Sequence, residues 1–295
     1  MQIRPEDQIV LDHVAARRDD LIERAVDWAN INSGSRNADG LDRVLGAIER
    51  SVEHLPCAVE RVATAASSRI EDDGTEVPLN FAPALKLTLR PDAPIQIVLT
   101  GHYDTVFDAD SPFQTVGTRD DGALHGPGIA DMKGGISVLL GALEAFEQHP
   151  DKARVGWSVL LSPDEEIGSP GSAPLLAELG ARGHLGLTYE PSLPDGSLAG
   201  ARKGSGNFHI VVRGKSAHAG RAYHEGVNAM AGAARLATAL DDLNGQREGV
   251  TVNVARISGG APLNVVADTA VVRFNVRVPD PEAADWTLAQ IQDLV

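Results

Sequence analysis

Hydrophobic positions recur every three or four residues near the start of the chain, between Pro5 and Ile31 and again between Gly40 and Leu55. This spacing predicts amphipathic helices. Farther on, short apolar runs bounded by turn residues predict strands at Cys57–Thr64, Ala84–Leu89, Ile95–Thr100, Arg154–Leu161 and His184–Tyr189, with helices at Met132–Gln148 and Pro170–Gly180. Because strands alternate with helices, we expect an α/β fold whose sheet is covered on both faces.

The stretch Ser192–Gly206 is rich in Gly, Ser and Pro and is the best candidate for a domain boundary. The pattern beyond it predicts a strand, a helix, two strands and a helix, at Asn207–Arg213, Glu225–Leu243, Val250–Ser258, Ala267–Arg277 and Pro281–Val295. We therefore expect a larger domain over residues 1–204 and a smaller α+β domain over residues 205–295. A unit with this order of elements usually has one more strand, so the second domain is expected to lack its last strand.

Composition narrows the range of functions. The chain has 295 residues, with 41 acidic and 26 basic side chains and a formal net charge of −15, which disfavours nucleic acid and anionic lipid as partners. The sequence holds no apolar run of about 18 residues and no N-terminal signal pattern, so we expect neither a membrane span nor export. A single cysteine, Cys57, suits a reducing compartment and has the character of an ordinary buried thiol. We expect a cytoplasmic protein.

His102 and Asp104 directly follow the predicted strand Ile95–Thr100. Ligands of α/β proteins gather beyond the carboxyl ends of parallel strands, so this is a favourable place for chemistry. A metal-bound histidine usually donates its second ring N–H to a carboxylate, a role that Asp104 could fill. The alternative is a loop histidine beside a turn aspartate.

A glycine-rich loop, Gly126–Gly135, leads into a predicted helix. Asp131 stands where the dinucleotide-binding pattern G-x-G-x-x-G requires its third glycine, and the Gly-Lys-Ser/Thr ending of a phosphate-binding loop is absent. A carboxylate at this place would repel phosphate, so a nucleotide-dependent enzyme is disfavoured. We interpret Asp131 as a metal ligand, with helix capping as the alternative.

Acidic residues follow two further predicted strands: Glu165 and Glu166 after one, and Glu190 after another. A run of acidic residues is ordinarily a solvated turn. Two neighbouring glutamates can also have different roles, one binding a cation and the other acting as general base. One imidazole with several carboxylates suits a pair of water-activating zinc ions rather than a closed structural site, which uses cysteines. The serine elbow G-x-S-x-G of the α/β-hydrolases is absent from the sequence.

The motifs GHYDTV, GPGIADMKGG, DEEIGS, YEP and GKSAHAG, in this order, resemble the di-zinc family of acetylornithine deacetylase, succinyl-diaminopimelate desuccinylase, aminoacylase and glutamate carboxypeptidase. The glutamate carboxypeptidase branch is nearest. The resemblance, which runs from about Gly101 to Arg277, implies a zinc-exopeptidase-like catalytic domain with helices on both faces of a mixed sheet. It also implies a smaller lid or dimerisation domain.

The resemblance assigns the metal ligands. It implies that Asp131 bridges two zinc ions, that His102 and Glu190 hold one of them, and that Glu166 holds the other together with a final histidine. It further implies a cis peptide between Asp131 and Met132.

The resemblance also assigns roles around the metal. Glu165 would be the catalytic base, and Asp104 the partner of His102. In the second domain, His218 resembles a histidine that the partner subunit contributes to the active site of a homodimer. Asn264 and Arg277 match positions that hold the substrate.

All nine histidines lie at or before His224, so we expect the family's last zinc ligand and the return segment of the catalytic domain to be missing from this chain. The expected function is that of a zinc-dependent metallopeptidase or N-acyl-amino-acid deacylase that cleaves a terminal peptide bond or an N-acyl amino acid. Cobalt or manganese could replace zinc. The alternative is a truncated or inactive family member that only binds metal and dimerises.

Overall fold

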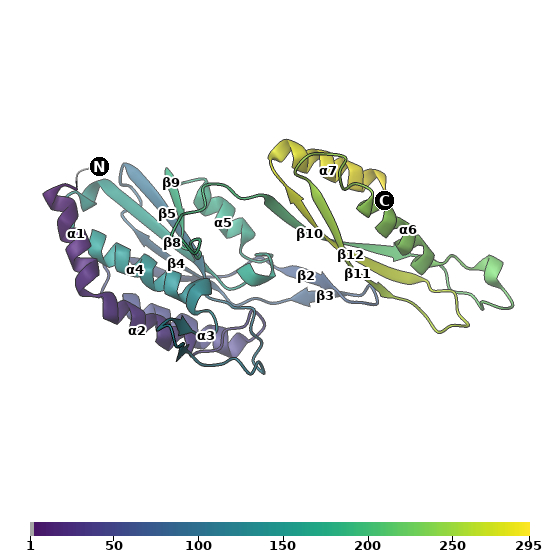
Figure 1. The fold of residues 1–295 in the computed structure, drawn as a ribbon, viewed down its shortest axis with the longest axis horizontal. Coiled ribbons are helices and arrows are strands. Elements are labelled where there is room, and N and C mark those ends of the chain that lie inside the picture. Colours follow the sequence, from purple (N-terminus) through teal and green to yellow (C-terminus); the bar gives the residue numbers. More distant parts are fainter. Residues whose placement is uncertain (1–2) are drawn as a thin grey trace. The chain divides into compact units, whose positions relative to one another are not determined.

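The computed structural model describes residues 3–295. Contacts divide the chain into two compact units (Figure 1). Unit 1 comprises the residues up to Ser67 together with residues 80–193, and unit 2 comprises residues 68–79 and 194–295. The sequence placed the boundary after residue 204. The observed division lies after Leu193 and also assigns an earlier, inserted segment to unit 2.

Unit 1 is built on a five-stranded mixed sheet with the strand order β1-β4-β8-β5-β9. Strand β5 pairs in parallel with β8 and with β9, whereas β4 pairs antiparallel with β8 and with β1. The bounds are Ala58–Val62 for β1, Ala84–Leu89 for β4, Ile95–His102 for β5, Val155–Ser162 for β8 and Leu185–Thr188 for β9. The three parallel strands therefore end at one edge of the sheet.

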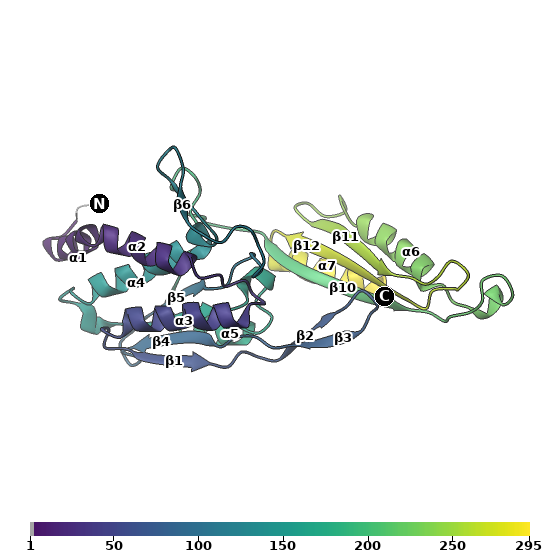
Figure 2. The ribbon, with the colours of Figure 1, turned by 90° about the horizontal axis from the view of Figure 1, so that it is seen from below.

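Helices cover both faces of this sheet, as the sequence predicted. The helices of unit 1 are α1 (Pro5–Ala16), α2 (Arg18–Ala29), α3 (Ala38–Val52), α4 (Gly134–Phe146) and α5 (Ala173–Gly180). Helices α3 and α4 bury Leu45 and Leu140 in the main core, and α5 places Leu179 against Val98 on the opposite face. Figure 2 shows α3 lying along the sheet. The helical stretch expected from residue 5 to residue 31 is in fact two helices, which divide at Arg17.

Two short hairpins were not predicted. One joins β2 (Ser67–Ile70) to β3 (Glu76–Leu79), and the other joins β6 (Gly117–Thr118) to β7 (Leu124–His125). The first hairpin belongs largely to unit 2 because two arginines of that unit bind its backbone. Arg213 Nη2 donates to Gly74 O at 2.8 Å, and Arg273 Nη2 donates to Ile70 O at 2.7 Å.

Unit 2 is an antiparallel three-stranded sheet with the order β10-β12-β11 and two helices. Its elements are β10 (Gly204–Arg213), α6 (Ala229–Asp241), β11 (Thr251–Gly259), β12 (Thr269–Val278) and α7 (Pro281–Asp293). Helix α6 begins four residues later than predicted, where the Asn228 side chain accepts a hydrogen bond from the Ala231 amide. Phe274 and Leu240 are buried in the core of this unit.

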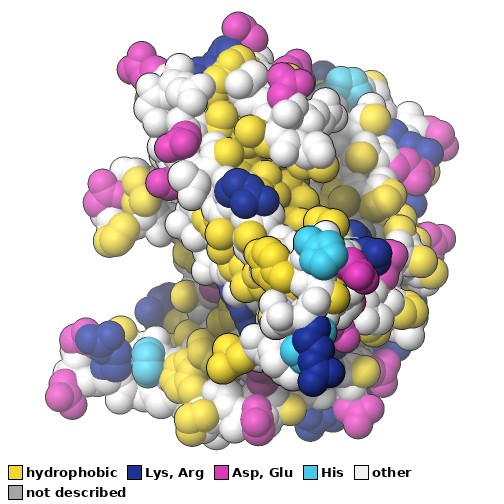
Figure 3. Space-filling view, turned by 90° about the vertical axis from the view of Figure 1, so that its right-hand side faces the viewer, with side chains coloured by type: hydrophobic (Ala, Val, Ile, Leu, Met, Phe, Trp, Pro, Cys, Tyr) yellow, Lys and Arg dark blue, Asp and Glu magenta, His cyan; other side chains and the backbone are white. Residues whose placement is uncertain are grey.

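Charges of both signs lie interspersed on the face drawn in Figure 3, so the net negative charge is not concentrated there. Across residues 3–295, none of the helices is both long enough and apolar enough to span a membrane.

Candidate metal centre

The candidate residues of unit 1 meet at the carboxyl ends of its parallel strands. His102 is the last residue of β5 and pairs in register with Ser162, the last residue of β8. Glu165 and Glu166 begin a short 3₁₀ turn after β8, and Glu190 comes two residues after β9. Ligand sites of α/β sheets form at this edge, so the order of the strands brings together residues that are distant in sequence.

Asp131 reaches the same place from the turn Ile129–Lys133, which precedes α4. Gly128, just before this turn, has φ +67°, and a Cβ there would lie 2.6 Å from the Thr105 methyl carbon. Only glycine fits such a position, because it combines a left-handed backbone with a close approach. The peptide bond between Asp131 and Met132 is cis, as the sequence resemblance implied.

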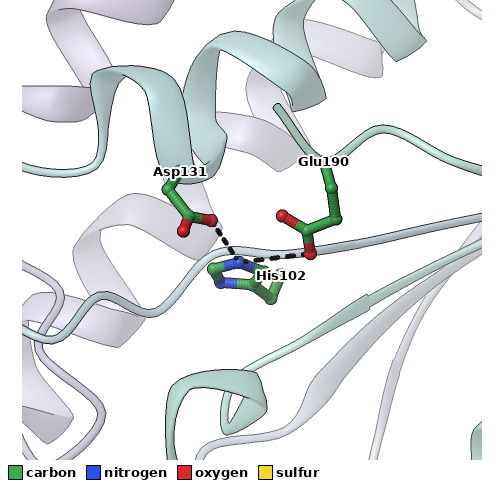
Figure 4. Close-up of side chains that lie close together, drawn as sticks. All are labelled: His102, Asp131 and Glu190. Atoms are coloured by element: carbon green, nitrogen blue, oxygen red, sulfur yellow. Dashed lines mark hydrogen bonds and ion pairs between the residues drawn. The ribbon is translucent and has the colours of Figure 1, made fainter. Parts of the chain in front are cut away.

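Three side chains converge closely enough to hold a metal ion (Figure 4). His102 Nε2 lies 3.0 Å from Asp131 Oδ1 and 3.6 Å from Glu190 Oε1. Within residues 3–295, this is the group in which one ligand atom from each of three side chains lies within 4.8 Å of the others. The His102 side chain is 1% exposed, whereas that of Asp131 is 55% exposed. One imidazole and two carboxylates, open to solvent on one side, fit a divalent metal ion with a free coordination position.

The electrostatics of this group favour a bound cation. Burial opposes protonation of His102, but its hydrogen bonds to Asp104 and Glu190 outweigh burial and raise the pKa of His102 to about 11. Burial and the charge of Asp131 raise the pKa of Glu166 to about 7. Burial and the charge of Glu190 likewise raise the pKa of Asp131. Carboxylates that disfavour one another's charge in this way are stabilised by an added positive ion.

Asp104 lies behind His102 and is fully buried. His102 Nδ1 lies 3.1 Å from the backbone carbonyl oxygen of Asp104 and 3.2 Å from its Oδ1, which leaves Nε2 of the ring facing Asp131. The same carboxylate accepts the backbone amides of Glu165 at Oδ1 and of Glu166 at Oδ2, each at 3.2 Å. Asp104 therefore contacts both the histidine and the turn that carries the two glutamates.

The two glutamates differ in position. Glu165 Oε2 lies 3.9 Å from His102 Nε2, and the side chain is 49% exposed. Glu166 is not in the three-residue group, although it is close enough for the charge of Asp131 to affect its pKa. The structure thus brings Glu165 to the open side of the group and leaves Glu166 beside it.

The predicted site residues of unit 2 are all exposed. His218 and Asn264 lie on neighbouring loops, because Ala219 N donates to Asn264 O at 2.9 Å and His218 bridges to Val265. The Nδ1 atom of His218 accepts the amides of Gly220 and Arg221 at 3.1 and 3.2 Å. Arg277 is elsewhere, near the end of β12, where its Nε donates to Asn275 Oδ1 at 3.0 Å.

Sequence reasoning missed two side chains near the metal centre. Ser35 Oγ donates to Asp104 Oδ2 at 2.6 Å, across 69 positions of the chain. Lys133 is 1% exposed and donates from Nζ to Ile31 O at 2.8 Å, and burial lowers its pKa to about 7. No local pattern marks Ser35, whereas Lys133 lies within the glycine-rich motif but looks like an ordinary charged residue.

Comparisons with known proteins show what the chain is similar to. Residues 200–295 match the peptidase dimerisation domain of the M20 family. The chain is 27% identical over 269 residues to carboxypeptidase G2 of Pseudomonas sp. (strain RS-16), which covers 90% of this chain and 61% of that protein. It is 34% identical over 220 residues to a succinyl-diaminopimelate desuccinylase of Methylorubrum extorquens, covering 66% of this chain and 55% of that protein. The chain thus spans less than two thirds of the length of these curated relatives.

The fold is similar to that of a solved M20 family metallo-carboxypeptidase, Sso-CP2 from Sulfolobus solfataricus. The TM-score is 0.65 at 16% identity, over 94% of this chain and 76% of that one. The dimerisation-domain match lies in unit 2, and the alignment with carboxypeptidase G2 covers most of both units. In its sequence matches the chain is thus similar to members of the M20 peptidase family, and its fold agrees with that similarity.

Proposed function

We propose that this protein is a metal-dependent amide hydrolase that cleaves a terminal peptide bond or an N-acyl amino acid. The observation that carries the proposal is the convergence of His102, Asp131 and Glu190, with Glu165 on the open side of the group. The similarity to a carboxypeptidase and to a desuccinylase supports amide bonds as the target.

His102, Asp131 and Glu190 would hold one zinc ion, and Asp131 with Glu166 would contribute to a second. A bound zinc ion polarises a carbonyl group and lowers the pKa of bound water towards neutrality, and cobalt or manganese can do the same. Glu165 would accept the proton of the attacking water and pass it to the leaving amine. Asp104 would keep the His102 ring oriented with Nε2 towards the ion.

Unit 2 would supply dimerisation and substrate contacts. Its match to a peptidase dimerisation domain supports a homodimer formed through residues 205–295. In that arrangement His218 would act at the partner's metal centre, while Asn264 and Arg277 would hold the substrate. A guanidinium suits this task because its fork of donors binds a carboxylate in a bidentate manner.

A second candidate is a metal-binding, dimerising protein without hydrolytic activity. It is favoured by one observation: the group that meets the spacing for a metal ion has ligands for a single ion and does not include Glu166. The two candidates differ in whether bound metal is accompanied by amide hydrolysis.

The test is metal titration combined with a hydrolysis assay. The metal-free protein is titrated with Zn²⁺, and the loaded protein is assayed on a panel of dipeptides and N-acyl amino acids. We expect hydrolysis that requires metal, and loss of binding in His102→Ala. His184→Ala is the matched control, because His184 is exposed directly before β9 and its ring accepts only the Gln96 amide among the hydrogen bonds of the described residues. Metal binding without hydrolysis of any panel member would favour the second candidate, and no metal binding would contradict both.

A further inference from the structure

The segment of residues 32–37 lies along the residues that follow β5. Thr105 N donates to Ser33 O at 2.9 Å, and Ser35 N donates to Thr105 O at 3.2 Å, in a short parallel bridge between Gly34 and Thr105. The Ser33 hydroxyl also donates to Tyr103 O at 2.7 Å. The segment between α2 and α3 is thus hydrogen-bonded to the loop that carries Asp104.

Close packing keeps this segment in place. A Cβ on Gly34 would lie 2.3 Å from Phe107 O, so only glycine permits the observed approach of the two backbones. Asn32 is buried, and its Nδ2 donates to Phe107 O at 3.2 Å and to Asp108 O at 3.1 Å. Ser35 is therefore held beside Asp104 by contacts that do not involve its own hydroxyl.

The hydroxyl of Ser35 is one of several donors on the Asp104 carboxylate. Oδ1 of Asp104 faces His102 Nδ1 and the Glu165 amide, each at 3.2 Å. Oδ2 accepts the Glu166 amide at 3.2 Å and the Ser35 hydroxyl at 2.6 Å, which is the shortest of the four contacts. A hydroxyl–carboxylate bond of this length is a strong, charge-assisted hydrogen bond.

We propose that Ser35 is a positioning residue that fixes the orientation of the Asp104 carboxylate and, through it, the His102 ring and the turn that carries Glu165. This inference rests on the proposed function, because its effect is expressed at the metal centre. Without the hydroxyl, Oδ2 of the buried carboxylate keeps one donor, and rotation of the carboxylate would misalign Oδ1 with His102. Loss of such an outer contact commonly lowers metal affinity or activity about 10- to 100-fold.

The experiment compares Ser35→Ala and Ser35→Thr with the wild-type chain. Co²⁺ is the probe, because its visible absorption reports both affinity and ligand geometry. Ser51→Ala is the matched control: Ser51 is also half-buried, and its hydroxyl donates to Ile48 O at 2.7 Å within α3, away from Asp104. Metal-free thermal unfolding of each variant measures any purely structural effect.

We expect Ser35→Ala to bind Co²⁺ about 10-fold more weakly, with an altered spectrum. Ser35→Thr, which keeps the hydroxyl, should restore both properties, and Ser51→Ala should bind as the wild type does. If hydrolysis is measurable, kcat should fall in Ser35→Ala while KM changes little.

Wild-type Co²⁺ affinity and spectrum in Ser35→Ala would overturn this proposal and leave the proposed function intact. A loss of affinity that Ser35→Thr does not restore would also count against it, since the hydroxyl would then not be the cause. If the wild-type chain itself binds no metal, the proposed function and this inference both fail.

Discussion

Asp104 accepts the backbone amide of Glu165 at Oδ1, with nitrogen and oxygen 3.2 Å apart, although 61 positions separate the two residues. The same oxygen faces Nδ1 of His102. One buried carboxylate therefore links the candidate metal-ligating histidine to the turn that bears the candidate base. Changes at Asp104 should affect both.

Asp104→Asn tests this link. In asparagine, an NH₂ group replaces one of the two carboxylate oxygens, so at least one N–H or O–H group that now donates to Asp104 would face another donor. The substitution also removes the negative charge behind His102. We expect metal affinity to fall about 10- to 100-fold. Calorimetric titration with Zn²⁺ measures the change, with Asp110→Asn at an exposed loop position as control. Unchanged affinity would show that Asp104 does not support the ligand.

Glu165 and Glu166 should respond differently to substitution. Glu165→Gln should retain bound metal and lose hydrolysis by about 10²- to 10⁴-fold, the usual contribution of a general base. Glu166→Ala should instead lose the second metal ion and keep the first, because in the proposed site Glu166 contributes only to the second ion. Metal content after dialysis and initial rates are measured on both variants. Full turnover by Glu165→Gln would remove this residue from the proposed mechanism.

His218 offers a test of dimeric action. If His218 serves the partner's metal centre, mixing a Glu165→Gln protein with a His218→Ala protein should restore part of the lost activity through hybrid dimers. Each variant alone should be nearly inactive, and His218→Ala should bind metal normally. The control is a mixture in which subunit exchange has been demonstrated with tagged chains. Exchange without recovery of activity would mean that each subunit works alone.

Glu147 should make the stability of unit 1 depend on pH. Its carboxylate is 8% exposed, accepts two hydrogen bonds from Arg90 at 2.8 and 2.6 Å, and accepts Trp157 Nε1 at 3.0 Å. Burial raises the pKa of Glu147, but the bonds from Arg90 and Trp157 outweigh burial, and the net pKa is lowered. A carboxyl group whose pKa is lower in the folded than in the unfolded state stabilises the fold at pH values above the usual glutamate pKa of about 4.3. This stabilisation is lost as the pH falls through the folded-state pKa.

Glu147→Gln should therefore lower the free energy of unfolding at pH 7 by about 1.5–3 kcal/mol, the range for hydrogen bonds to charged groups. The difference from the wild type should shrink as the pH falls through the lowered folded-state pKa of Glu147, because the wild-type carboxylate then becomes protonated. Urea unfolding at several pH values measures it. Glu178→Gln is the control, because its ion pair with Arg182 is exposed and should contribute little. A pH-independent difference would contradict the assignment.

The sequence by itself determined most of the local elements and pointed to the residues of the candidate metal centre. The apolar run at Ile95–Thr100 predicted strand β5, which extends to His102, and the helical pattern at Met132–Gln148 predicted α4. These predictions succeed because hydrophobic periodicity reflects which side of an element is buried. His102, Asp131 and Glu190 were recognisable because each lies just after a predicted strand or in a glycine-rich turn.

Only the tertiary structure decided which distant segments meet. The hairpin β2–β3 belongs largely to unit 2 through Arg213 and Arg273, and Ser35 reaches Asp104 across 69 positions. Such contacts depend on the order of strands in the sheet and on backbone hydrogen bonds between loops, which leave no periodic signal in the sequence. Lys133 is a further example, since a lysine pattern predicts exposure and only the surrounding core encloses it. Periodicity records whether a position is buried, whereas the identity of its neighbours is fixed only when the chain folds.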